Sequence, residues 1–186
     1  VLPPMGDDGL AIGSAILTAL EVGEDVSWLK DYTMPYFGDE YTREQVKQAL
    51  DVFDNITVED LENTWPEEAA KSVAKGNICS LFHGRMEFGP RALGNRSIVA
   101  DPMHENIRQR INSTVKRRPN YQPFCPSILE EERERLFEVS FAHKHMAIAF
   151  RMKEEFIKDL PCAVHVDGTA RPQFVEEKDN PSYYRY

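Results

Sequence analysis

The chain has 186 residues, of which 41% are hydrophobic and 28% are charged. This composition is that of one globular domain, or one domain and a fragment, and it excludes a collagen-like, mucin-like or mostly disordered chain. The 31 acidic residues outnumber the 22 basic ones, and the net charge of −9 argues against a histone-like coat on nucleic acid.

The longest apolar stretch, Gly9 to Leu20, has 12 residues, fewer than the roughly 20 that cross a bilayer. We therefore expect no transmembrane helix and no membrane partner. The first residues lack a basic start and an apolar core, so no signal peptide is predicted. Three cysteines, Cys79, Cys125 and Cys162, lie far apart without a C-x-x-C pair, which favours a reducing, cytoplasmic location.

The first third of the chain is predicted to be mainly helical. Leu10 to Leu20 carries alternating small and apolar residues, which suits a packed helix with Asp7 or Asp8 as its N-cap. Thr42 is followed three residues later by Gln45, a capping-box signature that begins a helix ending near residue 53. A third helix is predicted between residues 66 and 76, where a proline opens it and a glycine closes it.

Strands and helices alternate through the rest of the chain. Ile107, Ile111 and Val115 recur at the spacing of one helix face. The predicted strands cover residues 78–82, 97–100, 146–152, 163–166 and 170–175, the predicted helices cover 103–115 and 129–137, and residues 123–127 are extended. This alternation predicts an α/β or α+β fold.

Positive charge is concentrated in residues 84–118, which hold eight basic and three acidic residues in an otherwise acidic chain. A local basic segment of this kind favours anion binding. The alternative is that these arginines pair with acidic residues elsewhere in the fold.

The most unusual segment is Gly84 to Ile98, with glycines at 84, 89 and 94 and arginines at 85, 91 and 96. Glycine permits close approach of the backbone, and each guanidinium offers forked donors that match phosphate or carboxylate oxygens. The segment contains neither G-x-x-x-x-G-K-[ST] nor G-x-G-x-x-G, so the two standard nucleotide motifs are excluded. It predicts an oxyanion site that depends on arginine side chains.

Several motifs in this order resemble the carbamoyltransferases of the NodU and TobZ type. They are residues 84–98, Ala-Asp-Pro at 100–102, residues 112–118, Pro-Phe-Cys-Pro-Ser at 123–127, and His-Val-Asp-Gly-Thr-Ala-Arg-Pro-Gln at 165–173. Residues 3–15 look like the last helix of the actin-like ATPase (ASKHA) domain that precedes the C-terminal domain of these enzymes. We therefore expect a C-terminal fragment of a longer enzyme. Residues 1–25 would be the remnant of the ASKHA-like domain, 26–64 a helical linker region, and 65–186 a YrdC-like domain truncated at its end.

The resemblance implies an α/β fold in which a YrdC-like twisted mixed β-sheet, flanked by helices, forms a basic cavity. In the family this domain uses ATP and carbamoyl phosphate to make carbamoyl adenylate, with release of pyrophosphate and phosphate. The N-terminal ASKHA-like domain of the same polypeptide then transfers the carbamoyl group to a hydroxyl or other acceptor on a small molecule. The implied cofactors are ATP with Mg²⁺, and iron or another divalent metal in the ASKHA-like domain.

The resemblance also assigns residues to the site. Arg91 and Arg96 match the phosphate-contacting arginines of the G-P-R-A-L-G-N-R run, which hold carbamoyl phosphate or the ATP phosphates. Lys116 and Arg118 match the K-x-R motif of YrdC-like proteins. Lys116 would be a compact cation near the reacting oxygens and Arg118 a forked clamp. Lys116 and Arg96 are the implied catalytic residues.

Further correspondences and departures lie outside these two motifs. Arg171 matches another nucleotide-site arginine, with Thr169 as an additional contact, and Asp7 matches an aspartate that helps to hold a metal with histidines upstream of this chain. Pro119 and Gln122 stand at two positions that are charged in relatives, and the chain stops at Tyr186 before the N-T-S-F-N segment that supplies further nucleotide contacts. Because of these departures, the ligand contacts of relatives at positions 119 and 122 are not expected to carry over, and the isolated chain is expected to bind ligand poorly or to lack turnover.

Other chemistry has weaker support in the sequence. His143 and His145, like His165 and Asp167, offer only two ligands each, which is typical of surface or structural residues more than of a metal site. No cysteine has an evident histidine partner, so a thiol nucleophile is disfavoured. Glu87 is open to three interpretations, namely proton transfer, orientation of an arginine, or an Arg–Glu pair within the loop.

Two other classes of function stay open at this point. The alternative to an enzyme domain is a YrdC-like module that binds double-stranded RNA along the basic segment. Only Phe88 is aromatic within that segment, with Tyr121 and Phe124 just after it, so stacking side chains do not interleave with the bases. Nucleic acid is therefore disfavoured as a partner. A purely structural interaction domain is the third class.

Overall fold

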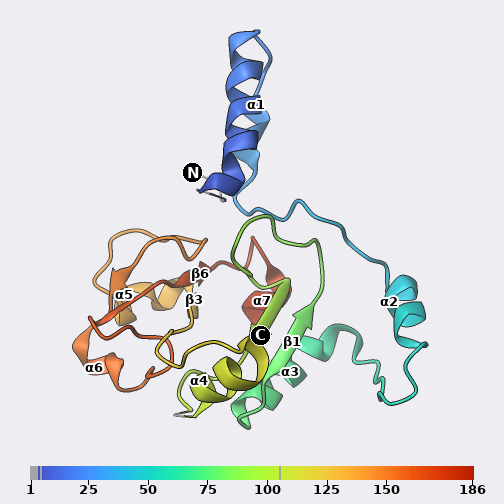
Figure 1. Ribbon diagram of the computed structural model, residues 1–186, viewed down its shortest axis with the longest axis vertical. Coiled ribbons are helices and arrows are strands. Elements are labelled where there is room, and N and C mark those ends of the chain that lie inside the picture. Colours follow the sequence, from blue (N-terminus) through green and yellow to red (C-terminus); the bar gives the residue numbers. More distant parts are fainter. Residues whose placement is uncertain (1–3, 5, 105) are drawn as a thin grey trace.

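A computed structural model describes residues 4, 6–104 and 106–186 (Figure 1). Residues 1–3 and 5, which belong to the expected ASKHA-like remnant, and Glu105, which belongs to the predicted helix 103–115, lie outside the described residues. Helix α1 (Leu10–Glu21) projects from the body of the molecule, and a long segment leads from it past helix α2 (Arg43–Leu50) (Figure 1). The strands and the remaining α-helices form the body (Figure 1).

Short elements alternate through the body and its connections. Besides α1 and α2, the α-helices are α3 (Trp65–Ala74), α4 (Ile107–Arg110), α5 (Arg133–Leu136), α6 (Glu154–Ile157) and α7 (Pro181–Arg185). The strands are β1 (Cys79–Phe82), β2 (Arg96–Val99), β3 (Ser127–Leu129), β4 (Phe150–Arg151), β5 (Thr169–Ala170) and β6 (Gln173–Val175). The 3₁₀ helices are η1 (Asp7–Gly9), η2 (Ser27–Asp31), η3 (Glu62–Thr64) and η5 (Glu130–Glu132), and η4 (Ile111–Lys116) is a π-helix.

The described strands pair into three separate two-stranded sheets. Strands β1 and β2 are antiparallel, with Phe82 opposite Arg96, whereas β3 and β6 are parallel and β4 and β5 antiparallel. The mixed α/β class predicted from the sequence is confirmed. The described residues form these small sheets in place of the one mixed sheet that the resemblance implies, because no strand pairs with more than one neighbour.

Local helix signals in the sequence are confirmed at two helices. The capping box of α2 is formed, since Gln45 N–H donates to Thr42 Oγ1 and Thr42 N–H donates to Gln45 Oε1. Helix α3 carries its proline in the first turn, and Gly76 follows its end with a φ of +84°. The predicted cap of α1 by Asp7 or Asp8 is wrong, because both residues lie in η1 and Gly9 occupies the N-cap.

Several predicted strands are shorter than expected. The predicted strand at 163–166 is wrong. His165 N–H bonds to the Thr169 carbonyl, and Gly168 N–H bonds to the His165 carbonyl, which turns the chain. The predicted strand at 170–175 is divided between β5 and β6 at Pro172, which has no N–H to donate. Of the predicted strand 146–152, only Phe150 and Arg151 form a ladder.

Predicted helices in the second half are also divided. Helix 103–115 consists of α4 followed by the π-helix η4, and helix 129–137 consists of η5 followed by α5. The largest buried cluster lies beside α5 and comprises Leu136, Phe137, Phe150, Met152, Val164, Ala170 and Phe174. The rings of Phe137 and Phe174 meet edge to face there, with centroids 5.7 Å apart. This packing joins elements that pairing alone leaves separate.

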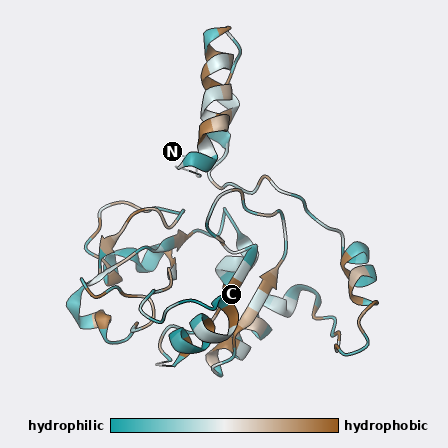
Figure 2. Ribbon diagram, viewed as in Figure 1, coloured by the Kyte–Doolittle hydropathy of each residue, from teal (hydrophilic) through white to brown (hydrophobic). Residues whose placement is uncertain are grey.

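Helix α1 contains no buried residue, and hydrophobic residues occur along it (Figure 2). No helix within the described residues has the length and apolar character needed to span a membrane. The predicted division into residues 1–25, 26–64 and 65–186 stays a prediction.

Candidate functional site

The Gly-rich segment between β1 and β2 turns at three glycines. Gly84, Gly89 and Gly94 have φ values of +54°, +121° and +117°, which residues with a Cβ rarely adopt. A Cβ at Gly94 would lie 2.6 Å from the ring of Tyr183. Glycine at this position therefore lets helix α7 pack directly on the turn.

A buried carboxylate holds the segment from inside. Glu87 Oε1 accepts hydrogen bonds from the N–H groups of Leu93 at 2.8 Å, Asn95 at 2.8 Å and Arg96 at 3.1 Å. Glu87 is 9% exposed, and no ion pair to it is found among the described residues. Among the described residues, the Arg–Glu pair that was one of the three interpretations of Glu87 does not form, and the carboxylate instead accepts from backbone N–H groups.

Distant segments hold the same turn from outside. The carbonyl of Leu93 accepts from Tyr36 Oη and from Gln173 Nε2, each at 2.9 Å. Asn180 Nδ2 donates to Asn95 Oδ1 at 2.7 Å. Gln173 ends the motif at 165–173 but had no predicted role, and Tyr36 and Asn180 were not predicted at all, because nothing in their local sequence signals a contact with a turn far along the chain.

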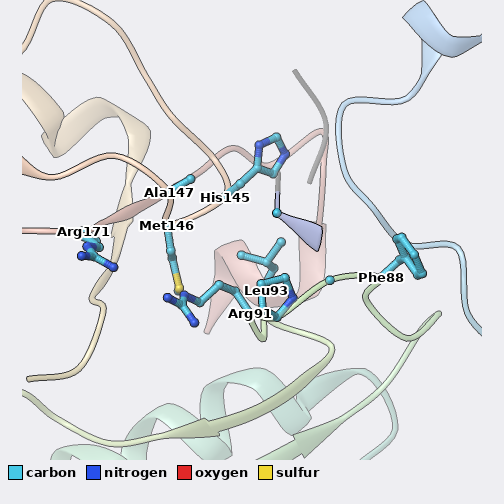
Figure 3. A pocket seen from close by; sticks show the side chains of 10 residues that line it. Phe88, Arg91, Leu93, His145, Met146, Ala147 and Arg171 are labelled. Atoms are coloured by element: carbon cyan, nitrogen blue, oxygen red, sulfur yellow. The ribbon is translucent and has the colours of Figure 1, made fainter. Parts of the chain in front are cut away.

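A cavity of about 190 Å³ lies beside this turn (Figure 3). Its wall comprises Gly6, residues 88–91, Leu93, residues 145–147 and Arg171. Arg91 and Arg171 reach it from separate segments of the chain (Figure 3). Both are exposed, and neither guanidinium has a hydrogen bond or ion pair to another described residue. Their donors are available to an anion.

Three of the predicted arginines converge on the thiol of Cys125. Burial raises the pKa of Cys125, while the positive charges of Arg91, Arg171 and Arg118 lower it. A guanidinium must lie close to a thiol to act on its pKa. The three arginines, from three different segments, therefore lie near enough to Cys125 for their charges to act on its thiol.

The K-x-R motif is held by a buried amide. Asn112 is fully buried, accepts from Arg118 Nε at 2.7 Å through Oδ1, and donates to the carbonyl of Gln122 at 3.1 Å. Arg118 also lies over the ring of Phe124, 4.6 Å from its centroid. Lys116 ends the π-helix η4 and is exposed, with no hydrogen bond or ion pair to a described residue. π-Helical turns are frequent at functional sites.

Arg96 is placed differently from the other predicted arginines. Its guanidinium donates to the carbonyls of His83, Asn95, Gly84 and Asp39, and it lies 3.7 Å from the ring centroid of Phe82. It is absent from the cavity wall. Four backbone carbonyls, including those of His83 and Gly84, thus use its donors, and its predicted phosphate-binding and catalytic roles stay predictions.

Thr169 is also engaged within the protein. Its Oγ1 and N–H both donate to Asp167 Oδ1, at 2.7 and 2.9 Å. These bonds, with a third from His165, lower the pKa of Asp167 to about 2. The His165–Asp167 pair thus belongs to a turn, and Thr169 does not line the cavity.

No metal site is assembled within the described residues, since no three histidine, cysteine, aspartate or glutamate side chains gather there. Asp7 is exposed in η1, next to Gly6 of the cavity wall. His143 and His145 pack edge to face, 5.4 Å apart, and burial lowers the pKa of each imidazole. Histidine rings that pack against each other in this way fit the structural interpretation.

Comparison with known proteins identifies the family. A family model described as "Carbamoyltransferase C-terminus" matches residues 70–186. The chain belongs to this family. The resemblance noted from the sequence motifs is confirmed.

Relatives of this carbamoyltransferase C-terminal domain match nearly the whole chain. An uncharacterised protein of Methanocaldococcus jannaschii is 66% identical over 100% of this chain and 31% of its own length. Nodulation protein NolO of Bradyrhizobium diazoefficiens is 38% identical over 99% of this chain and 34% of its own. A 3'-hydroxymethylcephem-O-carbamoyltransferase of Amycolatopsis lactamdurans is 32% identical over 100% of this chain and 33% of its own length. The chain spans about a third of the length of these relatives.

The matched carbamoyltransferase region includes every predicted anion-site residue and leaves Asp7 outside. Within it, the structure brings together Arg91, Arg118 and Arg171 and leaves Arg96 and Thr169 bonded elsewhere. The binding and catalytic roles assigned to all of these residues stay predictions.

Proposed function

We propose that this chain is the C-terminal part of an O-carbamoyltransferase. It would bind ATP and carbamoyl phosphate to form carbamoyl adenylate, and the carbamoyl group would pass to a hydroxyl of a small-molecule acceptor. The family match and the carbamoyltransferase names of two relatives support the reaction class. An N-terminal ASKHA-like domain in the same polypeptide would supply the transfer step. The YrdC-like architecture and a cytoplasmic location belong to the same proposal, and the absence of a disulfide bond among the described residues supports the latter.

The arginine placement supports binding of two polyanions in one site. ATP and carbamoyl phosphate repel each other, and negative charge moves onto the departing phosphate and pyrophosphate during the reaction. Arg91 and Arg171 would contact phosphate oxygens in the cavity, with Arg118 as a forked clamp held by Asn112. Lys116 would approach the reacting oxygens as a mobile point charge. Thr169 would contact a ligand only after its hydrogen bonds to Asp167 break.

The metals fit this proposal unequally. The cavity wall contains no carboxylate among its described residues, so Mg²⁺ would enter with the ATP phosphates, which is its usual mode of binding. A resident iron or other divalent metal does not fit the described residues, because Asp7 has no second and third ligand among them. Such a metal would need ligands from an ASKHA-like domain.

The observation that carries the proposal is the placement of Arg91 and Arg171 in the wall of one cavity, with exposed guanidiniums that have no hydrogen bond or ion pair to a described residue. Calorimetric titration with ATP plus Mg²⁺, with and without carbamoyl phosphate, tests it. We expect carbamoyl phosphate to change the affinity for ATP, because both ligands share these guanidiniums. Binding of long RNA with steep salt dependence and without competition by ATP would favour the nucleic-acid alternative.

Substitution of one arginine distinguishes ATP binding at a specific site from a general attraction to positive charge. Arg171→Ala removes a free guanidinium from the cavity wall, and we expect ATP affinity to fall at least about tenfold because charge-assisted bonds to phosphate are among the strongest. Arg43→Ala is the matched control, since Arg43 pairs with Asp60 at helix α2, away from the cavity. Equal losses in the two variants would contradict the site.

A further inference from the structure

We propose that Glu87 is a positioning residue for the anion site, because its carboxylate fixes the backbone that carries Arg91. This inference rests on the proposed function, in which Arg91 contacts a phosphate group. In this role Glu87 neither contacts the substrate nor transfers a proton.

The first observation is what Glu87 occupies. Glycine-rich turns commonly bind a phosphate oxygen through several converging backbone N–H groups. Here the N–H groups of Leu93, Asn95 and Arg96 all point to Glu87 Oε1. Because the carboxylate of the protein itself occupies these donors, they are closed to an external anion. At the cavity wall, this turn still offers the exposed guanidinium of Arg91 to an anion.

The second observation is that the turn is anchored on both sides of Arg91. After it, Leu93 is 1% exposed, and its carbonyl accepts from Tyr36 and Gln173. Before it, Phe88 N–H donates to the carbonyl of Pro35 at 2.7 Å. Glu87 directly precedes Phe88, so it joins the two anchors across the turn. The Arg91 guanidinium has no hydrogen-bond or ion-pair partner among the described residues, so the position of this backbone sets the region that it can reach.

The third observation concerns charge. A buried carboxylate is costly unless hydrogen bonds compensate it. Three N–H donors meet Glu87 Oε1, whereas no described lysine, arginine or histidine forms an ion pair with it. The carboxylate and the folded turn thus depend on each other. Loss of the charge weakens all three bonds at once, because charge-assisted bonds are roughly twice as strong as neutral ones.

The test compares Glu87→Gln and Glu87→Ala in the whole polypeptide. Glutamine keeps an acceptor oxygen at the same reach without the charge, while alanine removes it. Binding of inorganic pyrophosphate and of carbamoyl phosphate is measured by calorimetry, and KM and kcat by carbamoyl-phosphate-dependent ATP–pyrophosphate exchange. We expect about a tenfold loss of affinity and rise in KM for Glu87→Gln with kcat within about twofold, and a larger loss for Glu87→Ala.

Hydrogen exchange at the amides of Leu93, Asn95 and Arg96 provides a readout that does not depend on activity. We expect faster exchange at these three positions in both variants. Met152→Ala is the control for general destabilisation, because Met152 is buried in the separate cluster beside α5. When its melting temperature falls as much as that of the Glu87 variants, Met152→Ala should leave KM and the exchange rates of the three amides unchanged.

Two failures are distinguishable. Wild-type affinity and wild-type exchange at the three amides in a folded Glu87→Ala variant overturn the positioning role. If the wild-type protein binds pyrophosphate but shows no carbamoyl-phosphate-dependent exchange, the proposed reaction fails. The pyrophosphate affinities of the variants then still decide the role of Glu87.

Discussion

The arginines of this chain differ in the hydrogen-bond partners that their guanidinium groups already have within the protein. Arg96 is bonded to four backbone carbonyls and packs on Phe82, whereas Arg91 and Arg171 are exposed beside the cavity without protein partners among the described residues. A guanidinium that is already satisfied stabilises the fold, and one that is free can bind a ligand. Within one short motif, Arg96 is therefore bonded to the fold, whereas Arg91 has donors available to a ligand.

Arg96→Lys should lower stability. An ammonium cannot serve several carbonyls in a plane or stack as a guanidinium does, and the lost hydrogen bonds predict destabilisation of about 1–3 kcal/mol. Thermal unfolding measures the change, with Arg43→Lys as a control at an exposed ion pair. An unchanged melting temperature for Arg96→Lys would show that the carbonyl contacts contribute little.

Cys125 reports on the arginines around it. Burial raises the pKa of the thiol and Arg91, Arg171 and Arg118 lower it, so removal of one positive charge should raise the pKa further. We expect Arg171→Gln to shift the pH midpoint of iodoacetamide labelling at Cys125 upward. A change in the solvent access of the thiol alters the labelling rate at every pH and leaves the pH midpoint where it was. Arg43→Gln should leave it unchanged, and the same midpoint in both variants would contradict the convergence.

At the scale of elements, the turn between β1 and β2 is defined by backbone conformation. Gly94 has a φ of +117°, and its Cβ position is blocked by the ring of Tyr183 at 2.6 Å. Gly13 lies inside α1 with nothing within 4 Å of a Cβ position. Alanine at these two glycines therefore has opposite consequences.

Gly94→Ala should destabilise the protein by about 1–3 kcal/mol from backbone strain alone, with an additional clash against Tyr183. Gly13→Ala should stabilise α1 by about 0.5–1 kcal/mol. Chemical denaturation and circular dichroism measure the two effects. The double variant Gly94→Ala, Tyr183→Ala tests the clash, because it should be less destabilised than the sum of its single changes.

At the scale of the whole molecule, burial of histidines makes stability depend on pH. Burial lowers the pKa of His83, of His143 and of His145 below the ordinary 6.5. The unfolded chain binds protons first as pH falls, so this contribution is complete above about pH 6.5 and is lost as pH falls through the lowered folded values.

The melting temperature should therefore decrease between pH 7.5 and pH 5. Glutamates with lowered pKa values, such as Glu67 and Glu131, titrate below 4.5 and lie outside this window. His145→Gln should reduce the decrease, because it removes one group that takes up protons on unfolding. An equal decrease in this variant would assign the effect to other groups.

Local features of this protein could be predicted from the sequence. The capping box of α2, the proline that opens α3, the strands β1 and β2 and the turning glycines between them follow from interactions among near neighbours in the chain. The ordered motifs also identified the family, since their residue types and spacing do not depend on the fold being known.

Only the tertiary structure decided which of these residues share a site. The approach of Arg91, Arg118 and Arg171 to Cys125, the occupation of Arg96 by carbonyls, and the contact of Glu87 with backbone N–H groups depend on how distant segments pack. The same holds for the pairing of the strands into three separate sheets, in which β5 and β6, on the two sides of Pro172, pair with different partners. Local patterns specify the conformation of a segment, whereas packing specifies its neighbours, and the neighbours determine whether a charged side chain holds the fold or faces a ligand.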